Sequence, residues 1–164
     1  MNFGRIRSAI GGRFLGILLS LFACYADATY PERDEQVMLV LDRYMDALNE
    51  LDLEGHVGTY HFPHFRHASG AVVVWETPED AMPILLLPEE ERRSRLRDAL
   101  GPKWERSEWR RREIVQGDDE KVHVLTAFVR LREDGSEIAR YDSLYVLTLE
   151  QGHWGIKGRS SFAP

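Results

Sequence analysis

The fold is decided by the segment DEQVMLVLDRYMDALNELDLEG, residues 34–55. Its apolar residues recur at intervals of three and four, which places them along one face of an amphipathic helix. These residues are Val37, Val40, Leu41, Tyr44, Met45, Leu48 and Leu51. Asp52 is a good helix N-cap, so a short second helix is expected over residues 53–60. The segment therefore predicts two consecutive helices at the start of the domain.

The next stretch of chain mixes extended and helical signals. Pro63 interrupts any helix over residues 61–67, and residues 71–75 read AVVVW, a β-branched strand. Residues 78–101 are predicted to be helical again, with a break at Pro88 and a stop at Gly101.

Beyond Lys103 the pattern is that of strands separated by turns. Turn residues at 117–119, 134–135 and 151–152 divide the remainder into four strands. Two-residue loops at the last two turns would place Phe128 opposite Tyr141 and Tyr145 opposite Gly158. The sequence thus predicts one α+β domain, with helices first and a meander of antiparallel strands after them. The sheet is expected to be strongly bent, with the helices packed on it to form a cone around one pocket.

Composition excludes several classes of protein. The 164 residues include 21 Lys and Arg against 27 Asp and Glu, a formal charge of −6, which argues against nucleic acid as a partner. The single cysteine, Cys24, rules out a disulfide framework and any cysteine-based zinc site.

The N-terminus has the form of a secretory signal peptide. Arginines at the start, an apolar run over residues 14–25 and an Ala-Asp-Ala site at 26–28 predict cleavage after Ala28 and export to the periplasm or beyond. Residues 29–164 then form the domain. The apolar run is too short for a stable membrane span. Two alternatives stay open: a lipid anchor on Cys24, and a mis-called start codon on a cytoplasmic protein.

Motifs for phosphate, dinucleotide or nucleophilic chemistry are absent from the sequence. The densest group of ionisable residues is HFPHFRH, residues 61–67. On a strand, His61 and His67 share one face while His64 points to the other, so no metal site is expected and His64 is assigned to a pocket wall. Residues 110–112 are three arginines, with Glu108 and Glu113 close by, as on a solvated sheet face.

The segments VLDRYMDALN, residues 40–49, and LDLEG, residues 51–55, resemble the opening of the nuclear transport factor 2-like superfamily. Its SnoaL-like and ketosteroid isomerase members begin in a similar way, and the resemblance extends over residues 34–162. The last strand, with Trp154 and Ile156 after a glycine turn, is also similar. The resemblance implies the cone-shaped, cystatin-like fold. It does not fix an activity, because this fold serves many functions.

The resemblance to ketosteroid isomerase implies candidate site residues. Tyr44 matches the tyrosine of that enzyme's oxyanion hole, and Asp142 falls where its protonated acid would be. The general base would correspond to about Ala68, which cannot accept a proton, so His64 or His67 is the nearest substitute. Leu48, Arg66 and Trp75 are assigned to the wall of the substrate pocket.

Strand alternation raises a separate question about Asp142. With regular turns, Asp142 shares a face with Arg140 and Arg159, whereas Tyr141 and Tyr145 occupy the face that resembles a core. A single β-bulge would invert such an assignment.

Two function classes follow from these residues. One is acid–base isomerase or lyase chemistry on a small apolar carbonyl compound, without a cofactor; the other is an exported, non-catalytic domain that binds a ligand or a protein. An assembly module is a weaker third. A homodimer through a sheet face is also expected, because Leu125, Val129 and Leu131 lie opposite the face of Tyr145 and Leu147.

Overall fold

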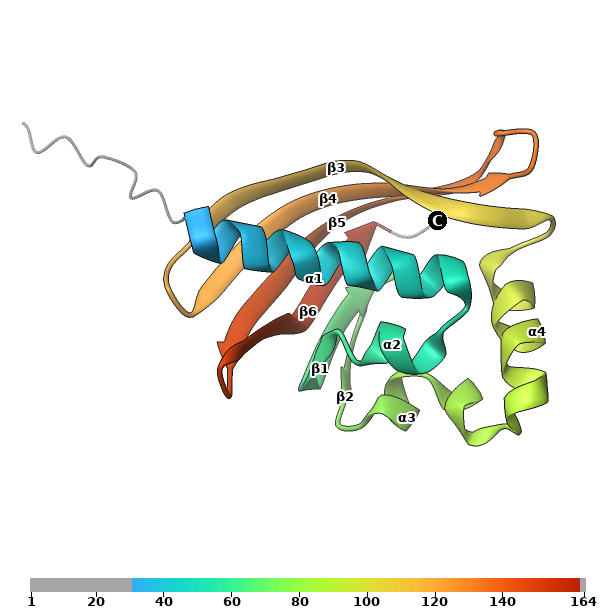
Figure 1. Ribbon diagram of the computed structural model, residues 1–164, viewed down its shortest axis with the longest axis horizontal. Helices are drawn as coiled ribbons and strands as arrows, with labels where there is room; N and C mark the ends of the chain where they lie inside the picture. The colour runs from blue at the N-terminus through green and yellow to red at the C-terminus, as the bar shows by residue number, and fades with distance from the viewer. Residues whose placement is uncertain (1–30, 163–164) are drawn as a thin grey trace, which may run out of the picture.

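A curved sheet of six strands, with helices packed against its inner face, makes up the part of the chain that the structure describes (Figure 1). The structure is a computed structural model that describes residues 31–162. The predicted signal peptide, residues 1–28, lies outside the described residues. The expected α+β class, with helices on a strongly curved sheet, is confirmed.

The helices follow the sequence pattern closely. They are α1 (Pro31–Glu50), α2 (Leu53–Val57), α3 (Pro78–Ala81), the 3₁₀ turn η1 (Pro83–Leu86) and α4 (Glu89–Leu100). Asp52 caps α2 by accepting a hydrogen bond from the Gly55 amide at 2.9 Å, as expected. The predicted helix over residues 78–101 is divided at Pro83 as well as at Pro88. No helix within residues 31–162 has the length and apolarity needed to cross a membrane.

The sheet brings the first strands beside the last one. Its strands are β1 (Tyr60–Ala68), β2 (Ala71–Trp75), β3 (Trp104–Gly117), β4 (Lys121–Arg132), β5 (Glu137–Glu150) and β6 (His153–Phe162). Their order is β2-β1-β6-β5-β4-β3. The pair β1–β6 is parallel and all other neighbours are antiparallel, so the sheet is mixed rather than wholly antiparallel.

The core lies between α1 and the inner face of the sheet. The apolar stripe of α1 is buried there, including Val37, Leu41 and Tyr44. It packs on Tyr145 and Ile156 of the sheet, both fully buried. Figure 1 shows α1 crossing the strands, while α2, α3 and α4 gather near one end of the sheet.

The register of the last hairpin differs from regular pairing by one residue. Phe128 pairs with Tyr141, as predicted. Tyr145, however, pairs with Arg159 instead of Gly158. The cause is a β-bulge: Leu147 pairs with Ile156 and Val146 with Gly158, so Lys157 is an extra residue in β6. The expected position of Arg159 beside Asp142 is therefore wrong, and Arg159 lies on the inner face with Tyr145.

The outer face of the sheet carries rows of charged side chains. Glu108 pairs with Arg106 at 2.7 Å and with Arg110 at 2.8 Å, and Arg111 pairs with Glu113. The solvated charges are confirmed for Arg110 and Arg111, whereas Arg112 is partly buried on the inner face and pairs with Asp42 of α1. Val129 and Leu131, expected to form an exposed apolar face, are instead buried. They lie opposite Glu108 and Arg106 in the β3–β4 pairing, so neighbouring charged side chains cover them.

Candidate functional site

A pocket of about 280 Å³ lies between α1, the segment from α3 to α4, and the inner face of the sheet. We call it the inner pocket. Its polar lining consists of Tyr44, His56, Arg66, Arg130, Tyr141, Arg159 and Ser161. Its volume is near the lower limit of about 300 Å³ that is typical of small-molecule sites.

Arg159 on β6 makes the central polar contacts of the inner pocket. Its Nη1 donates a hydrogen bond to the Tyr44 hydroxyl at 2.8 Å and a longer one to the Tyr145 hydroxyl at 3.4 Å. The Tyr145 hydroxyl donates to the Tyr44 hydroxyl at 3.4 Å. Burial raises the pKa of Tyr145 well above its usual value, so this phenol stays protonated. The three side chains link α1 to β5 and β6.

His56 of α2 supports the Tyr44 side of the pocket. Its Nδ1 lies 3.0 Å from the main-chain oxygen of Tyr44 and must therefore carry the proton that it donates. Its Nε2 then accepts a hydrogen bond from the Tyr60 hydroxyl at 3.3 Å. Burial lowers the pKa of His56 to about 4, so the ring is neutral near pH 7. It acts as a neutral positioning group.

Arg130 of β4 brings a further positive charge to the mouth of the inner pocket. One of its terminal nitrogens donates to the main-chain oxygens of Ala99 at 3.4 Å and Leu100 at 3.2 Å. These carbonyls belong to the C-terminal end of α4, which attracts cations. The guanidinium also lies over the ring of Tyr141, 4.9 Å from its centroid. Arg130 thereby fixes α4 against the sheet.

The opposite walls of the inner pocket are apolar. They come from α1, from the segment between α3 and α4, from α4 and from β4: Leu48, Met82, Ile84, Leu96, Leu100 and Phe128. The Phe128 ring stacks on Tyr141 with 4.7 Å between centroids. The inner pocket thus has a charged end and an apolar end.

Three of the residues assigned from the sequence line the inner pocket: Tyr44, Leu48 and Arg66. Tyr44 projects its hydroxyl from the apolar stripe of α1 toward the sheet, as the helical spacing predicts. Its hydrogen-bond partners, however, are Arg159 and Tyr145, and neither Asp142 nor His64 is among them.

Asp142 lies on the outer face of the sheet, away from the inner pocket. Its carboxylate is exposed and pairs with Arg140 of the same strand at 3.2 Å. Strand alternation predicted this face for Asp142, and the β-bulge in β6 does not change it. Asp142 and Tyr44 therefore do not form the pair of oxygen-binding donors that the resemblance implies.

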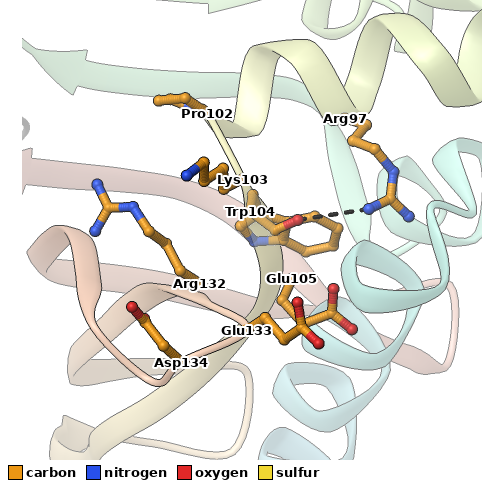
Figure 2. A pocket seen from close by; sticks show the side chains of 8 residues that line it. All are labelled: Arg97, Pro102, Lys103, Trp104, Glu105, Arg132, Glu133 and Asp134. Atoms are coloured by element: carbon orange, nitrogen blue, oxygen red, sulfur yellow. Dashed lines mark hydrogen bonds between the residues drawn. The ribbon is translucent and has the colours of Figure 1, made fainter.

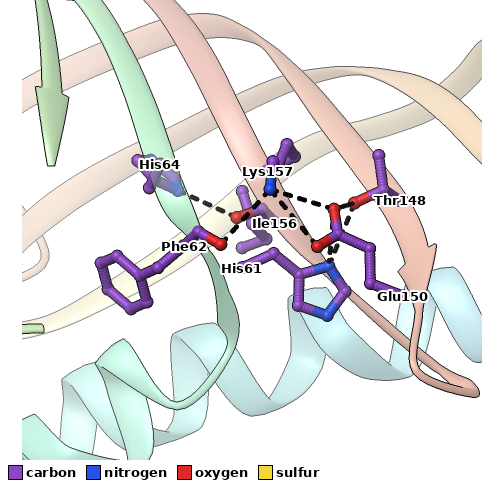
Figure 3. Close-up of polar contacts among 7 residues, drawn as sticks. All are labelled: His61, Phe62, His64, Thr148, Glu150, Ile156 and Lys157. Atoms are coloured by element: carbon purple, nitrogen blue, oxygen red, sulfur yellow. Dashed lines mark hydrogen bonds and ion pairs between the residues drawn. The ribbon is translucent and has the colours of Figure 1, made fainter. Parts of the chain in front are cut away.

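His64 is fully buried but lies outside the lining of the inner pocket. Its Nδ1 donates to the main-chain oxygen of Ile156 at 2.9 Å (Figure 3). The ring stacks between Tyr60 and Trp75, at 4.3 Å and 5.4 Å between centroids, and its Nε2 has no partner among the described residues. Burial lowers its pKa to about 4. Trp75 is accordingly part of this stack and is not among the pocket residues.

Sequence reasoning missed Arg159, Arg130 and His56. Arg159 was assigned to the outer face because the strand was read without a bulge. A signal was present in the sequence, since Gly155 and Gly158 flank the extra residue Lys157 and glycine inside a strand pattern often marks a bulge. His56 had no such signal, because its role depends on where α2 packs.

A second polar cluster lies on the outer face, where β1 meets the β5–β6 hairpin (Figure 3). His61 Nδ1 is 3.0 Å from the Thr148 hydroxyl and 3.7 Å from the carboxylate of Glu150. Lys157 approaches the same carboxylate at 3.1 Å. Burial lowers the pKa of His61, which leaves it neutral near pH 7. These contacts join the two strands of the parallel pair through their side chains.

A wider depression of about 950 Å³ lies between the end of α4 and the β4–β5 hairpin (Figure 2). Arg97, Lys103 and Arg132 line it together with Glu105, Glu133 and Asp134. Arg97 donates to the main-chain oxygen of Trp104 at 3.4 Å. Its three basic and three acidic side chains balance in charge. Within residues 31–162, no His, Cys, Asp and Glu side chains gather into a potential metal site.

Residues 34–160 match the family described as NTF2-like protein (DUF6841). The chain belongs to this family. Among curated proteins, none matches its sequence. Solved structures that resemble it have the NTF2-like, cystatin-like fold, which confirms the resemblance drawn from the helix segment.

One similar structure is a Nostoc punctiforme protein of unknown function with a cystatin-like fold. It has a TM-score of 0.61 and 14% identity, covering 82% of this chain and 93% of that one. An NTF-2 like protein of unknown function from Shewanella oneidensis gives 0.60 and 14%, covering 79% and 98%. A ketosteroid isomerase-like protein from Erwinia carotovora gives 0.53 and 17%, covering 82% and 98%. At these identities the likeness shows the fold alone.

Proposed function

We propose that this NTF2-like protein is a binding protein that holds a small organic molecule in the inner pocket. The observation that carries the proposal is the composition of the pocket: buried polar groups gather at one end and apolar side chains form the other walls. Such a cavity, with a few fixed polar groups in an apolar surround, is the usual form of a small-molecule site.

The positions of the ionisable groups favour binding over isomerase or lyase chemistry. Proton abstraction needs a base within hydrogen-bond reach of the bound substrate. His64 lies outside the pocket lining, and the Nε2 of His56 already accepts a hydrogen bond from Tyr60. The pocket lining contains no aspartate or glutamate. Acid–base chemistry on a carbonyl compound therefore remains the less favoured alternative.

The test uses a tryptophan that blocks the pocket mouth. Ala99 of α4 lines the inner pocket and is exposed, so Ala99→Trp fills the mouth without disturbing the core. Ser94→Trp is the matched control, since Ser94 is exposed on the same helix and is not a pocket residue. Ligand-observed NMR with a library of small metabolites should show hits that wild type and Ser94→Trp share and that Ala99→Trp loses. Hits that persist in Ala99→Trp would place binding elsewhere.

We also propose that the protein forms a homodimer through the outer face of the sheet. Leu125 and Leu144 are paired across β4 and β5 and stay half-buried there, as does Val146. A second copy would complete their burial. Light scattering at micromolar concentration should give twice the mass of one chain; a monomer would refute the proposal.

Export is the further proposal for the N-terminus, and it rests on the sequence of residues 1–28. Expression of the full chain in a bacterial host should yield a periplasmic protein whose N-terminal sequence begins after Ala28. A soluble cytoplasmic product with an intact Met1 would contradict it.

A further inference from the structure

Two arginines of the inner pocket lie side by side on neighbouring strands. Arg66 of β1 and Arg159 of β6 are directly opposite each other in the parallel pairing. Both line the inner pocket, so their side chains share its face of the sheet. Like charges placed opposite each other across strands repel one another. This pair therefore calls for a compensating negative charge.

The protein itself supplies no such charge to these two side chains. The partners of Arg159 are the neutral hydroxyls of Tyr44 and Tyr145, and its Nε is buried without a partner in the described part of the chain. For Arg66, no hydrogen bond or ion pair is found among residues 31–162. A guanidinium has five N–H donors, so most donors of this pair remain available.

The charge around the pair is positive throughout the inner pocket. Arg130 adds a third guanidinium, whose Nε is also buried without a partner within the described residues. Burial, and after it the charge of Arg159, lowers the pKa of Arg66 from its ordinary value. Buried charges without a counter-charge are costly, and proteins retain them mainly where a ligand or partner completes the site.

Tyr44 adds a hydrogen-bond donor at the same place. Its oxygen accepts hydrogen bonds from Arg159 and from Tyr145. Its own hydrogen can turn to the Tyr60 hydroxyl or to a new acceptor, because a hydroxyl hydrogen rotates to suit its neighbours. An oxygen entering the pocket beside Arg159 can therefore accept a hydrogen bond from Tyr44 as well.

We infer that the ligand of the inner pocket is an organic carboxylate, held by Arg66, Arg159 and the Tyr44 hydroxyl. A planar carboxylate accepts two hydrogen bonds from one guanidinium and has lone pairs left for a second donor. The inference rests on the proposed binding function and specifies the chemical class of the ligand.

The apolar end of the inner pocket predicts the chemistry of the rest of the ligand, beyond its carboxylate. Met82, Ile84, Leu96 and Leu100 offer no charged or hydroxyl group. A cavity of about 280 Å³ accommodates a ligand of roughly ten to fifteen non-hydrogen atoms, which consist of the carboxylate and an apolar body. The class is thus a small aromatic or alicyclic monocarboxylate.

The test compares ligands that differ only in charge. Benzoate, phenylacetate and cyclohexanecarboxylate are titrated into the full domain, each beside its neutral amide, with chemical shifts of pocket residues as the readout. Each carboxylate should bind at least tenfold more tightly than its amide, and 0.5 M salt should weaken only the carboxylates. Phenyl phosphate is a further arm, and tighter binding of phenyl phosphate than of benzoate would overturn the assignment to carboxylates.

Variants at Arg66 connect the charge preference to the proposed site. Arg66→Met should remove most of the difference between benzoate and benzamide, and Arg66→Lys should restore part of it. Arg140→Met is the matched control, because Arg140 is on the outer face and pairs with Asp142; it should leave both affinities unchanged. A carboxylate preference that survives Arg66→Met would overturn the inference.

The two proposals fail in different ways. Amides that bind as tightly as carboxylates, at resonances of pocket residues, would refute the carboxylate and leave the binding function standing. If neither series perturbs pocket resonances and Ala99→Trp matches wild type against the metabolite library, both proposals are refuted.

Discussion

Arginines on the outer face of the sheet have acidic partners, whereas the arginines that line the inner pocket do not. On the outer face, Glu108 bridges two arginines, and Arg111 and Arg140 each have an acidic partner two residues along the strand. On the inner face, Arg66 and Arg159 lie opposite each other and no carboxylate lines the pocket that they share.

This difference separates structural charges from charges kept for a ligand. Exposed ion pairs contribute little to stability, about 0–1 kcal/mol each. An outer arginine such as Arg106 also lies opposite a buried apolar residue, Leu131, which its stem helps to cover. Arg66 and Arg159 of the inner pocket gain no such pairing, in contrast to Arg112, which pairs with Asp42 of α1. Where a sequence keeps an unfavourable local arrangement, function is the common reason.

Histidines sharpen the comparison, because a histidine can lose its charge and an arginine cannot. His56 and His64 are buried on the inner side, and burial lowers the pKa of each to about 4. They stay neutral near pH 7 and avoid the cost of a buried charge. Arg66 and Arg159 cannot become neutral in this way, because a guanidinium keeps its proton in proteins.

The largest expected effect is a loss of stability in mild acid. The unfolded chain protonates His56 and His64 near the ordinary pKa of 6.5, whereas the folded protein does so only near 4. Stability is therefore full above pH 6.5 and is lost as the pH falls toward 4. Between pH 7.5 and 5.0 each histidine should cost about 2 kcal/mol, as urea unfolding would measure. The exposed His67 is the control: His67→Gln should keep the slope, and His56→Gln should reduce it.

Removing the deeper arginine should have the next largest effect. Arg159→Met should weaken benzoate binding by at least 30-fold, in line with the roughly 2–5 kcal/mol lost when one partner of a desolvated charge pair is removed. Arg140→Met should change the affinity by less than twofold. Calorimetric titration measures both affinities. Equal losses of benzoate affinity in the two variants would contradict the view that only the arginines of the inner pocket bind the ligand.

Arg66 provides a test without any ligand. Arg66→Met removes one of two repelling charges, so the unliganded domain should become more stable, by up to about 1 kcal/mol. The midpoint of thermal unfolding should rise by about 3 °C. Arg140→Met breaks an outer ion pair and should leave the midpoint unchanged or slightly lower it. A clear destabilisation by Arg66→Met would mean that Arg66 has a structural role.

The last prediction concerns the two residues that the resemblance to ketosteroid isomerase paired, and its expected effect is close to that of Arg66→Met. Tyr44→Phe removes one hydrogen bond to the bound carboxylate and should weaken benzoate about fivefold to tenfold, near the 1 kcal/mol of a typical hydrogen bond. Asp142→Asn should have no effect, because Asp142 is on the outer face. Equal effects on binding would mean that both side chains reach the ligand.

Local patterns in the sequence were sufficient for most of the fold. The spacing of Val37, Tyr44 and Leu48 predicts α1 and the side that it buries, and the turn residues divide the last part of the chain into four strands. The pairing of Phe128 with Tyr141 followed from the length of one turn. All of these signals come from residues close together in the chain.

The site was predictable only in part, because it depends on contacts between distant segments. Tyr44, Leu48 and Arg66 were assigned to the pocket, whereas Asp142, His64 and Trp75 lie outside its lining. Arg66 meets Arg159 only through the parallel pairing of β1 with β6, which no local pattern indicates. The opposition of two like charges was therefore not visible before the strands were placed.

The bulge in β6 allows related proteins to lose one residue at this point of the strand. Lys157 is an extra residue in the ladder, so a chain that lacks it would keep Ile156 and Arg159 on the inner face through regular alternation. The spacing between these two residues would then be two instead of three. An insertion or deletion elsewhere in the strand would exchange its faces. Homologous arginines in relatives are therefore expected at either spacing, and an alignment that forbids a gap at this position would misplace those at the shorter spacing.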